Sequence, residues 1–135
     1  MTPSSPRVPI RGLAFDLDGL LVNTEELYQH VGGELLRRRG RTFEPELLDR
    51  MMGRPQQVSL QIMIDWHGLA DTVETLARET GEIFSGLLDT RLEPMPGAIG
   101  LVEAVVQRGL PRGVATSSGP EFAHDVLSRV GLRDR

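Results

Sequence analysis

The sequence contains no cysteine and no lysine. Without Cys it can form neither disulfide bonds nor thiolate metal sites, which fits a cytoplasmic protein. All 15 basic residues are Arg, so a mechanism that needs a lysine ammonium must draw it from outside these 135 residues. The net charge of −4 gives no reason to expect a nucleic acid or a membrane surface as partner.

Long apolar runs are also lacking, and none approaches the length of a transmembrane helix. The first residues, Met-Thr-Pro-Ser-Ser-Pro, have no apolar stretch of the kind found in a signal peptide. Residues 1–9 are therefore expected to form a disordered tail. The remaining length is that of about one ordinary domain.

The most informative stretch is Phe-Asp-Leu-Asp-Gly at residues 15–19. It follows an apolar segment, so residues 10–17 are predicted to form a buried strand. Side chains two apart in extended chain point to the same side, so Asp16 and Asp18 can face one site. Paired carboxylates suit a hard cation such as Mg²⁺, and can also attack phosphorus and move a proton.

A solvated turn remains an alternative for this short motif, because Asp-x-Asp-Gly is common in turns. A calcium-binding loop is excluded, because Leu20 and Leu21 stand where ligand oxygens should recur and no Glu occupies the twelfth position. Taken alone, the motif leaves the turn and the phosphoryl-transfer site equally open.

Residues 24–92 carry a helical period. Helices are predicted to begin at Thr24 and Asp71, each as an N-cap, and at Pro45 and Pro55. The three consecutive Arg residues at 37–39 end the first helix and are interpreted as a solvated C-terminal turn, with anion binding as the less favoured alternative. The sequence thus predicts a compact helical cap over 24–92.

A linker near 92–97 precedes a helix ending at Gly109, a short apolar strand over 113–115 and a further helix from Pro120. Strand, helix and strand in this order predict a parallel pair. The second strand ends in Thr116, Ser117 and Ser118, whose hydroxyls and N–H groups can cradle a phosphate or simply cap the next helix. The parallel topology places them beside the two carboxylates.

These stretches together resemble the haloacid dehalogenase superfamily, in the branch with a small helical cap that contains beta-phosphoglucomutase and many sugar- and nucleotide-phosphate phosphatases. The matching residues are 15–25, 52–54, 95–97 and 114–119, and the resemblance extends from about residue 10 to the end. It implies an α/β fold: a Rossmann-like parallel-sheet core over 10–23 and 93–135, with an inserted α-helical cap over 24–92.

The resemblance also implies roles for single residues. Asp16 is the expected nucleophile, which becomes an aspartyl phosphate, and Asp18 the general acid and base. Both belong to the expected Mg²⁺ site, Asp18 through its backbone carbonyl. Thr116 and the N–H of Ser117 are expected to hold the phosphoryl oxygens. The implied activity is hydrolysis of a small phosphorylated metabolite, a sugar or nucleotide phosphate.

Gly53 and Arg54 correspond to a cap loop that faces the substrate in this family, although a solvated Arg after a helix is equally open for Arg54. The mutase has a His where Tyr28 stands, which favours a phosphatase and leaves a phosphosugar mutase as an alternative. Asn23 stands where many relatives carry Asp, without a clear consequence.

The family continues with a Lys and an acidic motif, and this sequence ends at Arg135 before either. Activity of the 135-residue chain is therefore expected to be impaired, because phosphoryl transfer depends on positioning and charge neutralisation. A non-catalytic fragment or binding module is the alternative. A two-stranded sheet also predicts exposed edges and self-association through them.

Overall fold

The computed structural model describes residues 6–135, so most of the expected tail over 1–9 lies outside the described residues. Residues 6–9 are exposed and have no regular secondary structure. The chain forms two compact units. One, here called the core unit, comprises the segment up to Asn23 and Glu93–Arg135; the other, the helical unit, is Thr24–Leu92.

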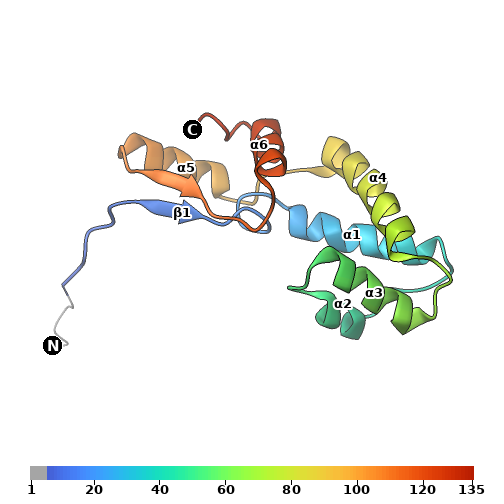
Figure 1. Ribbon diagram of the computed structural model, residues 1–135. Coiled ribbons are helices and arrows are strands. Elements are labelled where there is room, and N and C mark those ends of the chain that lie inside the picture. The colour runs from blue at the N-terminus through green and yellow to red at the C-terminus, as the bar shows by residue number, and fades with distance from the viewer. Residues whose placement is uncertain (1–5) are drawn as a thin grey trace. The chain divides into compact units, whose positions relative to one another are not determined.

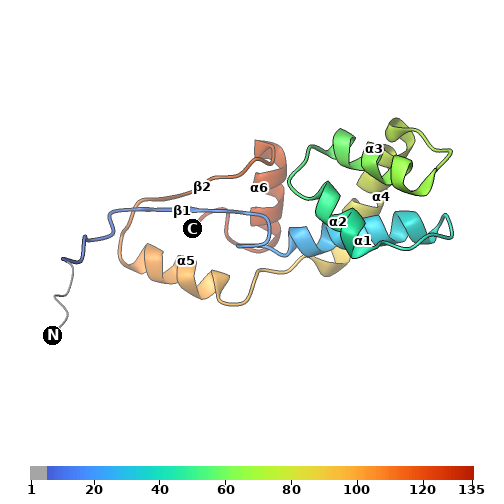
Figure 2. The same ribbon diagram turned by 90° about the horizontal axis from the view of Figure 1, so that it is seen from below.

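The core unit contains a two-stranded parallel sheet of β1 (Leu13–Phe15) and β2 (Arg112–Val114). Leu13 pairs with Arg112 and Phe15 with Val114. Helix α5 (Ala98–Gln107) connects the strands and α6 (Pro120–Arg129) follows β2; both lie beside the sheet in Figures 1 and 2. The predicted parallel pair and α/β class are confirmed.

The strands are shorter and more exposed than predicted. β1 is three residues long rather than eight, because only three residues of each strand have a partner in register. Phe15 is buried, but Ala14 and all three residues of β2 are exposed. In the described chain β2 has β1 on one side and no other strand, so its apolar residues lack cover.

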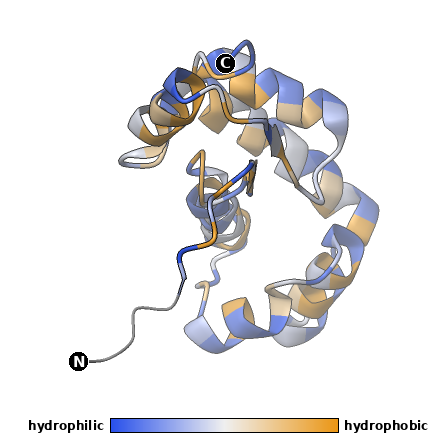
Figure 3. Ribbon diagram, turned by 90° about the vertical axis from the view of Figure 1, so that its left-hand side faces the viewer, coloured by the Kyte–Doolittle hydropathy of each residue, from blue (hydrophilic) through white to orange (hydrophobic). Residues whose placement is uncertain are grey.

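The helical unit consists of α1 (Thr24–Arg37), α2 (Pro45–Met51), α3 (Gln56–His67) and α4 (Val73–Arg91). Helix α4 packs on α1 and α3, and α3 also packs on α2. Apolar and polar positions alternate along the helical ribbons, as Figure 3 shows. The buried faces meet in a core that includes Leu27, Val31, Leu35, Leu36, Leu47, Met63 and Leu76.

One predicted helix cap is wrong. Thr72, not Asp71, caps α4, because the Thr72 side chain accepts a hydrogen bond from the N–H of Thr75 at 3.2 Å. The carboxylate of Asp71 instead accepts two hydrogen bonds from Arg39. A cap motif in sequence cannot reveal that a cation 32 residues away competes for the carboxylate.

Candidate functional site

The first half of the site is the turn that follows β1. Leu17 is fully buried, whereas Asp16 before it is exposed and Asp18 after it is half-buried. One carboxylate oxygen of Asp16 accepts a hydrogen bond from the N–H of Leu17 at 2.8 Å. The buried leucine therefore anchors the backbone between the two acids, and its own amide orients the first of them.

The turn itself is closed by the backbone. Gly19 has φ of 77°, in the left-handed region that favours glycine. Its N–H donates to the carbonyl of Val22 at 2.8 Å, and the N–H groups of Leu21 and Val22 donate to the carbonyl of Leu17 at 3.0 and 3.2 Å. These bonds give the loop that carries Asp18 a defined backbone path.

The second half of the site is the loop between β2 and α6. Thr116 and Ser118 are half-buried and Ser117 is exposed. The N–H of Ser118 donates to the hydroxyl oxygen of Thr116 at 3.1 Å. This bond folds the loop back just before Pro120 begins α6, so the Thr116 hydroxyl lies next to a helix N-terminus.

A side-chain hydrogen bond joins the two halves. The hydroxyl of Ser118 donates to a carboxylate oxygen of Asp18 at 2.8 Å, across 100 residues of sequence. Of the predicted site residues, Asp16, Asp18, Thr116 and Ser117 thus lie on two adjacent loops at the same ends of paired strands. The sequence placed Ser118 with Thr116 and Ser117 among the hydroxyls of the phosphate cradle, but it did not predict the bond from Ser118 to Asp18.

The donor set of these loops fits a magnesium ion in kind. Carboxylate and backbone carbonyl oxygens are the ligands that Mg²⁺ takes from proteins. Asp16 can supply a carboxylate and Asp18 a backbone carbonyl, and the described residues contain no cluster of three or more His, Cys, Asp or Glu that could hold a metal. The loop after β1 therefore offers part of an oxygen site, with one carboxylate and one carbonyl.

An open groove of about 540 Å³ lies on the core unit. Thr116 and Ser118 line it together with side chains that are mostly apolar, including Phe15, Leu21, Val102, Val114 and Leu127. The loop with Thr116 and Ser118 therefore borders a mostly apolar groove that also includes Val114 of β2.

The chain passes between the core unit and the helical unit twice, and the core-unit residues at these two points, Asn23 and Glu93, are hydrogen-bonded to each other. The N–H of Asn23 donates to the carbonyl of Glu93 at 3.1 Å, and the N–H of Glu93 donates to the side-chain oxygen of Asn23 at 2.9 Å. Met95 adds a bond from its N–H to the carbonyl of Leu21 at 2.9 Å. The sequence suggested no consequence of Asn23. In the structure its side-chain amide oxygen helps to join the two segments of the core unit.

Gly53 and Arg54, the predicted substrate-binding residues of the cap, lie in the helical unit directly after α2. Gly53 has φ of 73°, which requires the conformational freedom of glycine. The exposed Arg54 donates from Nε to the carbonyl of Arg50 at 2.7 Å. This bond directs the guanidinium back along the end of α2.

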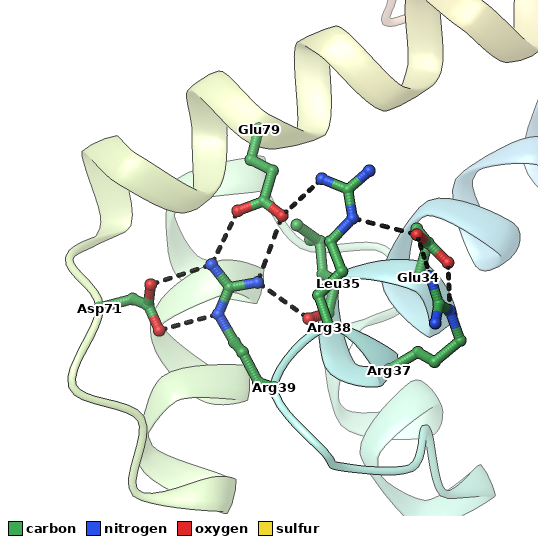
Figure 4. A network of polar contacts seen from close by, with 7 residues as sticks. All are labelled: Glu34, Leu35, Arg37, Arg38, Arg39, Asp71 and Glu79. Atoms are coloured by element: carbon green, nitrogen blue, oxygen red, sulfur yellow. Dashed lines mark hydrogen bonds and ion pairs between the residues drawn. The ribbon is translucent and has the colours of Figure 1, made fainter.

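The Arg residues at the end of α1 form an ion-pair network (Figure 4). Arg37 and Arg38 remain solvent-exposed, as predicted, whereas Arg39 is largely covered. Arg39 donates to Asp71 at 2.8 and 2.9 Å and to Glu79 at 2.7 Å, and Arg38 donates to Glu79 at 2.9 Å. These hydrogen bonds lower the pKa of Asp71 and of Glu79. The network joins the end of α1 to α4 and to the loop that precedes it.

Glu34 extends the same network on the surface of α1. Its carboxylate accepts hydrogen bonds from Arg37 at 2.7 and 2.8 Å and from Arg38 at 3.0 Å. These bonds, first from Arg37 and then from Arg38, lower the pKa of Glu34 to about 2. The basic run is therefore matched by acids of its own unit, which disfavours an anion site there.

No helix among the described residues is both long and apolar enough to span a bilayer.

The family model for haloacid dehalogenase-like hydrolases matches residues 13–135. Among curated relatives, (DL)-glycerol-3-phosphatase 1 of Arabidopsis thaliana is 32% identical over 114 residues, which cover 83% of this chain and 38% of that protein. Fructose-1-phosphate phosphatase of Escherichia coli is 29% identical over 122 residues, covering 90% of this chain and 64% of that protein.

Solved structures give the same result. A Thermotoga maritima protein assigned as a beta-phosphoglucomutase superposes with a TM-score of 0.77 at 26% identity, covering 93% of this chain and 58% of that one. A beta-phosphoglucomutase from Clostridium difficile, at 20% identity and a TM-score of 0.69, shares the fold. The chain thus spans between 38% and 64% of the length of these proteins.

Proposed function

The chain belongs to the haloacid dehalogenase-like hydrolases. We therefore propose that it functions as a Mg²⁺-dependent phosphomonoester hydrolase that works through an aspartyl-phosphate intermediate. The substrate is a small phosphorylated metabolite, a sugar or nucleotide phosphate. The relatives named as phosphatases of glycerol 3-phosphate and fructose 1-phosphate support this substrate class.

One observation carries the proposal: the hydrogen bond from Ser118 to Asp18 at 2.8 Å. It joins the loop with the carboxylates to the loop with the hydroxyls, which supports their acting in one site. A solvated Asp-x-Asp turn, the alternative for the motif alone, has no need of such a link to a second strand end.

In the first step a carboxylate oxygen of Asp16 forms a bond to phosphorus as the bond from phosphorus to the leaving oxygen breaks. Asp18 donates its proton to that leaving oxygen. In the second step Asp18 takes a proton from water, whose oxygen attacks phosphorus and releases Asp16 and inorganic phosphate. Thr116 and the N–H of Ser117 bind the phosphoryl oxygens through both steps.

Asp16 and the backbone carbonyl of Asp18 would hold the Mg²⁺, which would supply charge neutralisation for phosphoryl transfer. Gly53 and Arg54 act on substrate selection from the helical unit, where the bond between Arg54 and the Arg50 carbonyl directs the guanidinium. Tyr28, at the position of the mutase His, favours hydrolysis over transfer within the same sugar.

Intact-protein mass spectrometry after a rapid quench tests the assignment. The wild type with an activated phosphoryl donor and Mg²⁺ is expected to show a phosphoryl adduct on Asp16, and Asp16→Asn to show none. Asp18→Asn is expected to accumulate the adduct, because the attacking water has lost its base. An adduct on Asp18, or one that persists in Asp16→Asn, overturns the assignment; no adduct in any variant favours a non-catalytic binding module.

A further inference from the structure

We infer that Ser118 is a positioning residue, whose hydroxyl holds the carboxylate of Asp18 in the direction in which it transfers protons. The inference rests on the proposed function, because it concerns the proton carrier of that reaction. It adds a residue outside the phosphate-binding pair Thr116 and Ser117.

The first argument is the bond itself. At 2.8 Å, the distance from the Ser118 hydroxyl to Asp18 Oδ2 lies in the ordinary range for a hydroxyl donor. A hydroxyl bonded to a carboxylate is a charge-assisted donor, stronger than a bond between two neutral groups. Partial burial of the pair further reduces competition by water.

The second argument is that the donor is itself held. The N–H of Ser118 donates to Thr116 Oγ1 at 3.1 Å, and Gly119 and Pro120 begin α6 immediately afterwards. The backbone of Ser118 is thus restrained from both sides. Because its backbone is restrained, Ser118 can fix the orientation of the Asp18 carboxylate. A donor on a mobile surface loop would instead move together with the carboxylate.

The third argument concerns what Asp18 needs. Its backbone is restrained by the turn in which the N–H of Gly19 bonds the carbonyl of Val22. The Ser118 hydroxyl adds a restraint on the Asp18 side chain from the loop that follows β2. General acid catalysis requires the proton donor to be within hydrogen-bond reach of the leaving oxygen, so orientation decides its efficiency.

In the first step the bond from the Asp18 carboxyl group to hydrogen breaks and the leaving oxygen gains the proton. In the second step the Asp18 carboxylate gains a proton from water, and Ser118 keeps its own hydrogen throughout.

The experiment compares two phosphate esters that differ in their need for an acid. p-Nitrophenyl phosphate has a good leaving group that departs without a proton, whereas an alkyl phosphate does not. Ser118→Ala is expected to lower kcat about tenfold for the alkyl ester, a part of the ~10²–10⁴ that a positioned acid contributes. The loss with the aryl ester is expected to be clearly smaller.

Two further variants separate positioning from loop structure. Ser118→Thr keeps the hydroxyl and is expected to restore the alkyl ester rate, while Ser128→Ala removes an exposed hydroxyl from α6 and is expected to change neither rate. Equal losses with both esters, or no rescue by Thr, would show that Ser118 only shapes the loop and would overturn the inference.

A measurement without substrate checks the contact. In urea unfolding of the 135-residue chain, Ser118→Ala is expected to shift the midpoint less in an Asp18→Ala background than in the wild type. Fully additive shifts would refute the bond. If the wild type hydrolyses neither ester at high protein concentration, the proposed function fails and the role of Ser118 falls with it. If the wild type is active and Ser118→Ala loses the same factor with both esters, only the role of Ser118 is refuted.

Discussion

The helical unit covers its apolar residues far better than the core unit covers its sheet. Leu76 of α4 is fully buried, whereas Val114 of β2 remains 38% exposed. Yet the residues that suit phosphoryl chemistry lie in the less covered unit, at the ends of β1 and β2. Packing and candidate chemistry are thus separated, and each can be altered without the other.

The largest expected effect concerns the chemistry of the core unit. Assayed alone, the 135-residue chain is expected to hydrolyse p-nitrophenyl phosphate at least ~10²–10³ more slowly than the longer phosphatases it resembles, the usual cost of one missing charge-stabilising donor. The reason is that no Lys is present in the sequence to pair with the phosphoryl group. Release of p-nitrophenolate by a mass-verified sample, with Asp16→Asn as background, measures it; turnover similar to those enzymes would contradict it.

Truncation of Leu76 tests how much tight packing stabilises the helical unit. Leu76→Ala leaves a cavity between packed helices and is expected to lower the free energy of unfolding of the helical unit by about 2–5 kcal/mol. Val114→Ala, the matched truncation in the core unit, removes a side chain that is 38% exposed and should cost less than about 1 kcal/mol. Urea unfolding followed by circular dichroism measures both, and equal losses would show that the two units are equally packed.

The ion-pair network allows a sharper test inside the helical unit. The Arg39 side chain is 16% exposed and bonds two carboxylates, so Arg39→Gln is expected to destabilise the unit by about 1.5–3 kcal/mol, the range for hydrogen bonds to charged groups. Arg37 is 72% exposed, so Arg37→Gln should destabilise the unit much less, because solvent and salt screen exposed ion pairs. Thermal melting of both variants decides; similar shifts would mean that the network adds nothing beyond surface pairing.

Self-association through the exposed β2 edge follows from the same comparison. β2 pairs with β1 on one edge only in the described chain, and Val114 and the mostly apolar groove beside it have little cover. Val114→Arg is expected to shift the chain toward monomer in light scattering at increasing concentrations. Val58→Arg, at a position 43% exposed in the helical unit, is the control and should change nothing. A monomeric wild type would refute this role of the edge.

The smallest expected effect is the acid sensitivity of Glu34. Its pKa is lowered in the folded chain from 4.5 to about 2, so its stabilising contribution is present above pH 4.5 and is lost as the pH falls through about 2. The melting temperature should therefore decrease over this window, and less steeply in Glu34→Gln. Because the Glu34 side chain is in contact with solvent, 30% exposed, and both of its Arg partners are exposed, the difference should be small and should shrink in high salt. A slope unchanged by the substitution would contradict it.

Much of this fold could be predicted from local patterns. The period of apolar residues placed helices close to α1, α2, α3 and α4, and the strand–helix–strand order predicted the parallel pair. Local patterns failed where a distant group competes. Asp71 satisfies the sequence rule for a helix cap, but Arg39 binds it from 32 residues away.

The sequence by itself determined the chemical types at the candidate site, because Asp16 and Asp18 follow an apolar strand and Thr116 and Ser117 follow another. Only the tertiary structure decided that Ser118 bonds Asp18 and that Asn23 bonds Glu93. The physical reason is that periodicity and turn chemistry act over a few residues, whereas these bonds depend on the register of β1 with β2 and on the path of the chain through an entire inserted unit.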